Sequence, residues 1–282
     1  MKILVTGAYG QLGHDILLNL AARGIDGIPA DIAEFDITQT AATEQFIAAH
    51  QPDAVIHCAA YTAVDKAEDD VELCRLINVT GTENIAHACQ KINAKMVYIS
   101  TDYVFPGTGD TMYETDAQTA PVNTYGKTKL AGEFAVRQLL KRYFIVRTSW
   151  AFGKNGKNFV KSILRLGMEQ DEVNVVCDQV GSPTYTVDLA RLLVDMALSE
   201  RYGVYHATNE GFCSWAEFAK TILQKAGLSA RVNFVTTEQY PTRARRPFNS
   251  RLSKENLINA GFQPLPTWED ALERFLAEIA GE

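Results

Sequence analysis

The sequence predicts a doubly wound α/β fold, in which helices cover both faces of a parallel sheet. Short apolar segments of the kind that form buried strands recur at residues 2–6, 53–59, 95–101 and 143–148, with a weaker one at 27–30. Helical segments separate them, at residues 11–23, 40–50, 78–92 and 123–142. Strands that are buried on both faces form continuous apolar runs, and right-handed crossovers between such strands give this fold.

Beyond about residue 150 the alternation of strands and helices becomes less regular. Turns that contain glycine, asparagine or proline occur at residues 153–156 and 181–183. Further helices are predicted at residues 158–168, 187–199, 214–226 and 267–279. We therefore expect one domain over residues 1–150 and a smaller C-terminal α/β lobe over residues 151–282. The pattern leaves open that the chain crosses back to the first domain.

The composition is that of an acidic globular protein, with 282 residues, 46% of them hydrophobic, and a formal net charge of −7. Nucleic-acid-binding proteins usually carry a basic stripe, but basic residues gather here only at Arg243, Arg245 and Arg246. The five cysteines lack CxxC spacing, which favours free thiols in a reducing compartment. The first apolar run is too short for a signal peptide, and no apolar stretch approaches the length of a membrane span. We therefore expect a cytoplasmic protein with no nucleic-acid or membrane partner.

A glycine-rich turn joins the first predicted strand to the first predicted helix. It runs Gly7-Ala-Tyr-Gly10-Gln-Leu-Gly13, a GxxGxxG pattern. Such glycines allow a tight turn, close approach of the backbone to a pyrophosphate, and close packing of the helix on the strand. The N-terminus of the helix then offers N–H groups to the phosphates. An ordinary strand-to-helix turn is the alternative, but this position favours dinucleotide binding by the first domain.

A carboxylate at the end of the second strand would bind the hydroxyls of an adenosine ribose. Asp31, which lies 18 residues after Gly13, is the first candidate and Asp36 is the second. Either side chain could instead lie in a solvated loop or cap the helical segment that begins near Thr38. The sequence leaves these alternatives open.

Two further motifs bring together a hydroxyl, a phenol and an amine. Ser100-Thr101-Asp102 ends a predicted strand, and Tyr125 and Lys129 lie four residues apart on a predicted helix, hence on one face. A nearby ammonium lowers the pKa of a phenol, so that the tyrosine can donate a proton to a carbonyl that receives hydride. A Tyr–Lys pair alone is common on surface helices. The order of glycine loop, strand-end hydroxyl and Tyr–Lys helix is much more specific.

That order resembles the extended short-chain dehydrogenase/reductases and, more closely, the dTDP-4-dehydrorhamnose reductase family. The similar stretches are GAYGQLG (7–13), CAAYTAVDKAE (58–68), STDYVFPGTG (100–109), YGKTKLAGE (125–133), RTSWAFG (147–153), DQVGSPTY (178–185) and RPFNSRL (246–252). They extend over the chain from end to end. The resemblance implies a Rossmann-type fold whose C-terminal lobe binds the substrate. It also implies an enzyme that uses NADPH or NADH to reduce the C4 ketone of dTDP-4-dehydro-β-L-rhamnose, a nucleotide sugar.

The resemblance also implies roles for individual residues. Thr101, Tyr125 and Lys129 match the catalytic triad, in which the tyrosine and lysine also contact the cofactor. The other residues that match cofactor-binding positions are Gly10, Gln11, Leu12 and Gly13 in the pyrophosphate loop, Asp36 and Ile37 beside the adenine, and Ala59, Ala60 and Thr62 near the nicotinamide-side ribose. The residues that match substrate-contacting positions are Val104, Phe105, Trp150, Arg246, Asn249 and Arg251.

Some members of that family bind Mg²⁺ between subunits through three glutamates, and the matching positions here hold Asp15, Asp188 and Glu278. Because two of these side chains are a methylene shorter than glutamate, the sequence does not favour a bound Mg²⁺. The resemblance leaves a homodimer open. Two other functions also remain: another sugar-nucleotide reductase or epimerase, and a non-catalytic NADP-binding subunit like the regulatory subunit of methionine adenosyltransferase. Intact Tyr125 and Lys129 favour an enzyme.

Overall fold

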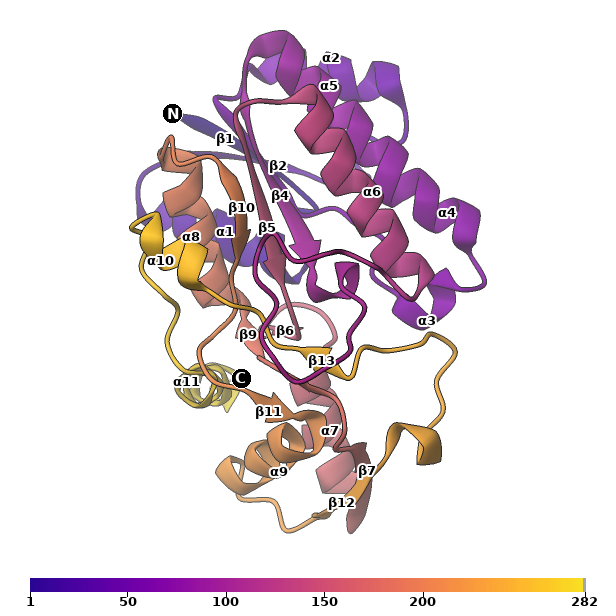
Figure 1. Cartoon of the computed structure of the whole chain (residues 1–282). Coiled ribbons are helices and arrows are strands. Elements are labelled where there is room, and N and C mark those ends of the chain that lie inside the picture. Colours follow the sequence, from indigo (N-terminus) through magenta and orange to yellow (C-terminus); the bar gives the residue numbers. More distant parts are fainter. Residues whose placement is uncertain (281–282) are drawn as a thin grey trace.

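The computed structural model describes residues 1–280, and its centre is a six-stranded sheet with the order β10-β5-β4-β3-β1-β2 (Figure 1). All neighbouring strands in it are parallel. They are β1 (Lys2–Thr6), β2 (Asp26–Ala30), β3 (Ala54–His57), β4 (Lys95–Thr101), β5 (Tyr143–Thr148) and β10 (Gly203–His206). The chain runs outward from β1 to β2 and then returns to the other side of β1 with β3. This switch in direction opens a crevice beyond the carboxyl ends of the strands.

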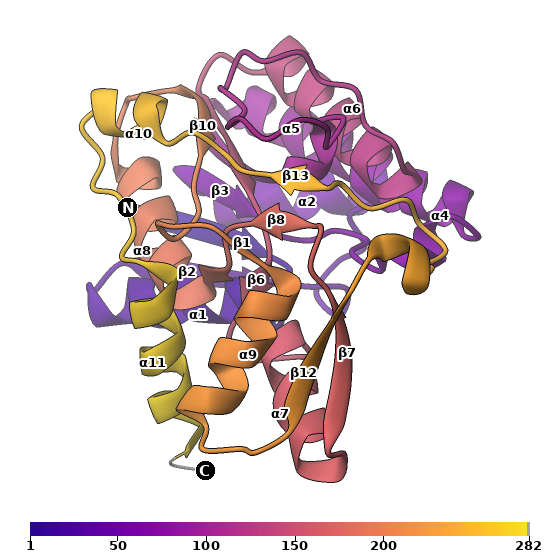
Figure 2. The same ribbon diagram turned by 60° about the horizontal axis from the view of Figure 1, so that its bottom comes forward.

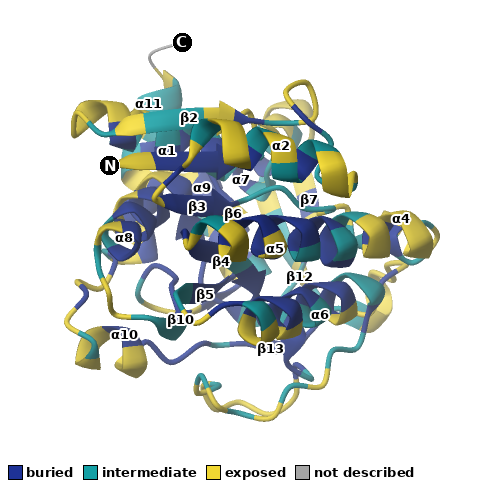
Figure 3. Ribbon diagram, turned by 90° about the horizontal axis from the view of Figure 1, so that it is seen from above, coloured by how far each residue is buried: buried dark blue, intermediate teal, exposed yellow. Residues whose placement is uncertain are grey.

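Helices cover both faces of the sheet, which confirms the predicted doubly wound fold. α1 (Gln11–Ala22) and α8 (Thr186–Leu198) pack together on one face. The other face is covered by α2 (Thr40–His50), α5 (Thr82–Ile92) and α6 (Thr124–Leu139). Figure 3 shows the central strands, mostly buried, between these two groups of helices.

Alternating side chains on the strands supply the two apolar cores. Ile3 and Val5 of β1 pack in one core with Leu193 of α8. Leu4, which lies between them, packs in the other core with Ile85 of α5. Successive side chains of a strand point to opposite faces, and full burial of one such side chain contributes about 1.5–3 kcal/mol. The continuous apolar run at residues 2–6 is therefore explained by burial on both faces.

A smaller lobe lies below the sheet in Figure 1 and comes forward in Figure 2. Its strands are β6 (Ala151–Phe152), β7 (Glu172–Val176), β8 (Val180–Gly181), β9 (Thr184–Tyr185), β11 (Cys213–Ser214), β12 (Arg231–Val235) and β13 (Asn249–Ser250). Its helices are α7 (Phe159–Glu169), α9 (Trp215–Lys225) and α11 (Trp268–Ala280). Phe152, Phe218, Trp268 and Phe275 are central to its apolar core. A capping box formed by Ser214 and Glu217 begins α9.

The chain crosses between the two halves more than once. α8 packs on α1, β10 pairs with β5 at the edge of the main sheet, and α10 (Glu255–Asn259) packs against β10. Residues after 150 therefore belong partly to the lobe and partly to the sheet, and a single boundary at residue 150 stays a proposal.

The region after β3 is more helical than the sequence pattern predicts. α3 (Val64–Ala67) and α4 (Val71–Arg75) precede a π-helix (Leu76–Gly81) that continues directly into α5. Within this π-helix, Asn78 accepts a hydrogen bond from the Tyr61 backbone N–H at 2.8 Å, which holds the loop after β3. Among residues 1–280, no helix is long and apolar enough to cross a membrane, and the five cysteines there are free thiols.

Candidate active site

A cavity of about 940 Å³ lies at the carboxyl ends of the strands, and most of the predicted site residues line it. From the predicted cofactor site these are Gly7, Gly10, Gln11, Leu12, Gly13, Asp31, Asp36, Ile37, Ala59, Ala60 and Thr62. Thr101, Tyr125, Lys129 and Trp150 line the same cavity. The fold thus brings together, in one crevice, motifs that are far apart in the sequence.

The glycines of the first turn serve two different purposes. Gly7 has a positive φ of 64°, and a Cβ at Gly13 would lie only 2.2 Å from the Gly7 carbonyl oxygen, so both positions need glycine for the turn itself. A Cβ at Gly10 would meet only that same oxygen, at 3.2 Å. Gly10 is also the N-cap of α1 and offers no capping side chain. The first N–H groups of α1 are therefore open to an anion in the crevice.

The two candidate ribose ligands differ in their contacts. Asp31 directly follows β2, and its carboxylate accepts the backbone N–H of Tyr9 at 3.3 Å and that of Ile32 at 2.9 Å. Asp36 accepts both the N–H and the hydroxyl of Thr38, at 2.9 and 2.8 Å. Asp36 therefore stabilises its own turn, and it lines the cavity as well. Asp31 has the position expected of the ribose-binding carboxylate.

The hydroxyl, the phenol and the amine meet because α6 approaches the end of β4 closely. Asn123 caps α6 by accepting the N–H of Gly126 at 2.8 Å. A Cβ at Gly126 would lie 2.2 Å from the Tyr103 carbonyl oxygen. The first turn of α6, which carries Tyr125, can therefore pack directly on the 3₁₀ turn Asp102–Val104 that follows Thr101.

The electrostatics of this group differ from the expected effect of Lys129 on Tyr125. Burial and the charge of Asp102 raise the pKa of Tyr125, and a hydrogen bond with Thr101 lowers it. Burial lowers the pKa of Lys129 to about 7, and its Nζ lies 4.1 Å from the centroid of the Tyr98 ring. The expected lowering of the Tyr125 pKa is not found, and burial is the largest influence on it. The phenol is therefore protonated at neutral pH, as a proton donor must be.

Asp102 is a further residue of the site, beyond those that the sequence predicts. Its side chain lines the crevice and is 3% exposed. It accepts the hydroxyl of Thr101 at 2.9 Å and that of Ser250, and burial raises its pKa to about 6. The available signal was a carboxylate directly after the strand-end hydroxyl. Its partner Ser250 lies 148 residues away in the chain, a contact that no local pattern predicts.

Several expected substrate contacts do not line the crevice. Val104 and Phe105 are 0% and 1% exposed and pack in a small apolar cluster with Leu252. Val104 ends the 3₁₀ turn that begins with the crevice residues Asp102 and Tyr103, and Phe105 directly follows it, so that both side chains enter the core.

The three polar residues of the C-terminal segment also contact protein groups. Arg246 forms an ion pair with Asp65 at 2.5 Å. Asn249 donates to the carbonyl oxygens of Thr108 and Thr111, and its own carbonyl accepts from Arg251. Asn249 thus holds the segment against the loop that follows β4, Arg246 holds it against α3, and Arg251 contacts its own segment.

One aromatic side chain, Trp150, lines the crevice on the side next to the lobe. Trp150 lines the cavity and has a positive φ of 51°, a strained conformation for a bulky residue. Its ring stacks on Trp215 of α9, with centroids 3.6 Å apart and an interplanar angle of 12°. Trp215 packs against the core of the lobe and thereby supports Trp150 at the crevice.

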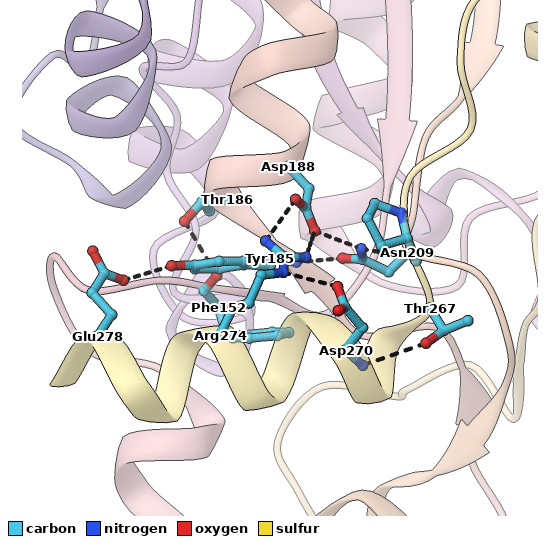
Figure 4. Close-up of polar contacts among 10 residues, drawn as sticks. Phe152, Tyr185, Thr186, Asp188, Asn209, Thr267, Asp270, Arg274 and Glu278 are labelled. Atoms are coloured by element: carbon cyan, nitrogen blue, oxygen red, sulfur yellow. Dashed lines mark hydrogen bonds and ion pairs between the residues drawn. The ribbon is translucent and has the colours of Figure 1, made fainter. Parts of the chain in front are cut away.

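The carboxylates at the possible Mg²⁺ positions already have other partners (Figure 4). Arg274 of α11 donates to both oxygens of Asp188, at 2.9 and 2.6 Å, and Asn209 donates to one of them. Glu278 accepts the hydroxyl of Tyr185 at 2.6 Å. Asp15 is the exception, with one buried oxygen that lacks a hydrogen bond. Within residues 1–280 no group of three or more side chains is arranged to hold a metal.

Comparisons with known proteins identify the family of this chain. A family model described as the RmlD substrate binding domain matches residues 1–280. The chain is 40% identical to the spore coat polysaccharide biosynthesis protein SpsK of Bacillus subtilis, over 98% of this chain and 97% of that protein. It is 38% identical to the dTDP-4-dehydrorhamnose reductase of Escherichia coli, over 99% of this chain and 98% of that protein.

Solved structures give the same result. The crystal structure of dTDP-4-dehydrorhamnose reductase from Bacillus anthracis in complex with NADP is similar to this chain with a TM-score of 0.96. The two are 45% identical, and the match covers 98% of this chain and 99% of that one. The chain therefore belongs to the dTDP-4-dehydrorhamnose reductase family, which the RmlD substrate binding domain model describes.

Proposed function

We infer that this protein catalyses the NADPH- or NADH-dependent reduction of the C4 ketone of dTDP-4-dehydro-β-L-rhamnose to dTDP-L-rhamnose. The observation that carries this inference is the single crevice that holds the glycine loop, Thr101, Tyr125 and Lys129. The similarity to reductases of this name over nearly the whole chain supports it.

The cofactor would bind along the strand ends. Its pyrophosphate would lie on residues 10–13, where α1 presents uncapped N–H groups. Asp31 would accept hydrogen bonds from the adenosine ribose, and Ala59, Ala60 and Thr62 would flank the nicotinamide half. The similar Bacillus anthracis enzyme was solved in complex with NADP, which supports a cofactor of this class.

A bound nicotinamide supplies the hydride that reduces C4. Tyr125 donates its phenolic proton to the oxygen of C4 as negative charge develops there. Lys129 binds ribose hydroxyls of the cofactor and stabilises the phenolate that Tyr125 becomes. Thr101 hydrogen-bonds the same substrate oxygen, for which its hydroxyl must turn away from Asp102.

The lobe would bind the deoxythymidine diphosphate half of the substrate. Trp150 and the neighbouring Trp215 offer a flat apolar surface beside the crevice. Arg246 could bind the diphosphate only by exchanging its ion pair with Asp65. We include no Mg²⁺ in the proposal, because Arg274 and Tyr185 already donate to two of the three carboxylates.

The localisation and the oligomeric state of the protein are also proposals. We place the protein in the cytoplasm as a homodimer, following its resemblance to the family. Sedimentation velocity with the purified protein tests the dimer, and a single monomeric species would contradict it.

Turnover with a panel of nucleotide-4-ketosugars tests the main assignment. Each substrate is offered with NADH or NADPH, loss of the reduced-nicotinamide absorbance is followed, and the product is identified by NMR. We expect the dTDP-4-dehydrorhamnose substrate to give dTDP-L-rhamnose. A clear preference for another base or sugar would point to a different sugar-nucleotide reductase or epimerase. Tight NADP binding without any turnover would favour a non-catalytic subunit.

A further inference from the structure

A buried ion pair lies one helical turn beyond Lys129. Glu133 of α6 is 0% exposed, and Arg147 of β5 is 1% exposed. Arg147 donates from Nε and Nη2 to the two carboxylate oxygens of Glu133, each at 2.8 Å. The hydroxyl of Ser100 donates to the same carboxylate at 2.6 Å.

These contacts join the elements that carry the reacting groups. Ser100 directly precedes Thr101 on β4 and lies opposite Arg147 on β5. Glu133 follows Lys129 by one turn of the same helix. The carboxylate of Glu133 therefore fixes α6 to β4 and β5, close to the residues that carry the reacting groups.

Stability alone is a weak explanation for this arrangement. Two charges lose their hydration when they are buried, and apolar replacements of such a pair are often neutral or stabilising. The pair belongs to a larger network of buried contacts. Arg147 also donates to the Thr115 carbonyl oxygen at 3.0 Å and lies beside His206 and the Phe105 ring.

Glu133 is also the carboxylate that faces the buried Lys129. The groups that act on Lys129 from neighbouring elements are His57 and Cys58 near the end of β3, Cys74 of α4 and Tyr98 of β4. Burial lowers the pKa of His57 to about 3 and raises that of Cys58 to about 12. Burial also raises the pKa of Cys74. These groups are therefore uncharged at neutral pH, whereas Glu133 supplies the largest effect that raises the pKa of Lys129.

We propose that Glu133 is a positioning residue of the reductase, which holds the Tyr125–Lys129 helix in register with Thr101 and supplies the negative charge opposite the Lys129 ammonium. The proposal rests on the proposed function, because it assigns Glu133 to the same reaction. Glu133 contacts neither the cavity nor the reacting atoms, and so acts through Lys129 and Ser100.

The test compares two variants that separate charge from packing. Glu133→Gln removes the negative charge and leaves Arg147 unbalanced. Glu133→Gln with Arg147→Met removes both charges of the pair. Arg137→Met is the matched control, because Arg137 is a half-exposed arginine of α6 that contacts the same carboxylate at 3.3 Å. Circular dichroism and thermal unfolding show which variants fold.

The decisive readout is the pH profile of kcat. Without the nearby carboxylate the ammonium of Lys129 is lost at lower pH, so the alkaline limb should move down by about one pH unit. We expect this shift in both Glu133 variants and no shift with Arg137→Met. If the pair had only a structural role, the double variant would regain the alkaline limb of the wild-type pH profile.

An unchanged alkaline limb in folded variants would overturn the proposal. Failure of both Glu133 variants to fold would assign the pair a structural role and would also count against it. If the wild-type protein reduces no nucleotide-4-ketosugar, the proposed function fails instead. Calorimetric NADPH binding as a function of pH then shows separately whether removal of Glu133 moves the titration.

Discussion

The two sides of the crevice differ in their chemistry. The side formed by residues 1–150 presents buried polar groups, among them Asp102, Tyr125 and Lys129, and burial shifts the pKa of each. The side next to the lobe presents Trp150, which is backed by Trp215 of the lobe. Groups of the first kind can transfer and hold protons, whereas flat apolar rings can only bind. We therefore expect changes on the first side to act on kcat or on cofactor binding, and changes on the second side to act on KM for the sugar nucleotide.

The largest effect is expected at Tyr125. Tyr125→Phe removes the proton donor but keeps the buried ring, which packs edge-on against Tyr103 with centroids 5.6 Å apart. Steady-state kinetics should show a decrease in kcat of about 10²–10⁴-fold, while calorimetry shows unchanged NADPH affinity. Near wild-type turnover would remove the catalytic distinction between the two sides.

The glycine loop should separate cofactor binding from folding. Gly10→Val is expected to abolish NADPH binding in calorimetry but to keep the fold, because only one backbone oxygen lies near its Cβ, and the larger side chain enters the space for the pyrophosphate. Gly13→Ala is the matched comparison. Its Cβ would lie 2.2 Å from the Gly7 oxygen, so its melting temperature should fall. Equal cofactor affinity in Gly10→Val and wild type would mean that the loop serves only the turn.

We expect the guanidinium of Arg274 to balance the charge of Asp188, so that no divalent cation is needed there. We expect EDTA to leave the melting temperature of the wild-type protein unchanged. Arg274→Met should destabilise it by about 1–3 kcal/mol, the cost of leaving a buried acceptor such as Asp188 without its donor. Added Mg²⁺ should then raise the melting temperature of the variant only. A lower melting temperature of the wild type in EDTA would show that a bound cation, rather than Arg274, holds these carboxylates.

The two sides of the crevice also differ in how far the sequence predicts their residues. Gly10 and Thr101 each belong to a short motif that follows or ends a strand, and a parallel sheet necessarily brings its strand ends together. Lys129 lies four residues after Tyr125 on one helix, which places the two on one face. Neither the Trp150–Trp215 stack nor the Arg274–Asp188 pair has such a signal, because 65 and 86 residues separate the partners. Val104 and Phe105 show the limit within a motif, since a single 3₁₀ turn directs them into the core.

A moderate effect is expected at Trp215. Trp215→Ala removes the ring that supports Trp150, and such aromatic pairs contribute about 0.5–1.5 kcal/mol beyond their buried area. KM for the sugar nucleotide should therefore rise roughly two- to tenfold, with little change in kcat. Trp268→Phe is the control, since Trp268 is buried in the core of the lobe and its loss should reduce stability without changing KM. A decrease in kcat with constant KM would place Trp215 in the catalytic half of the comparison.

The smallest effect concerns the choice of cofactor at Asp31. Its carboxylate lies at the end of β2, on the Tyr9 backbone N–H, where it would accept free ribose hydroxyls and repel a 2′-phosphate. We expect the wild type to use both NADH and NADPH, and Asp31→Ala to shift the ratio of kcat/KM toward NADPH. A like-charge contact at a partly solvated site is worth about 1 kcal/mol, or roughly a few-fold to tenfold in that ratio. Asp36→Ala is the matched control, because Asp36 accepts from Thr38 in its own turn and should leave the ratio unchanged. If only Asp36→Ala changes the ratio, the ribose lies beyond β2 rather than at its end, and the assignment of Asp31 fails.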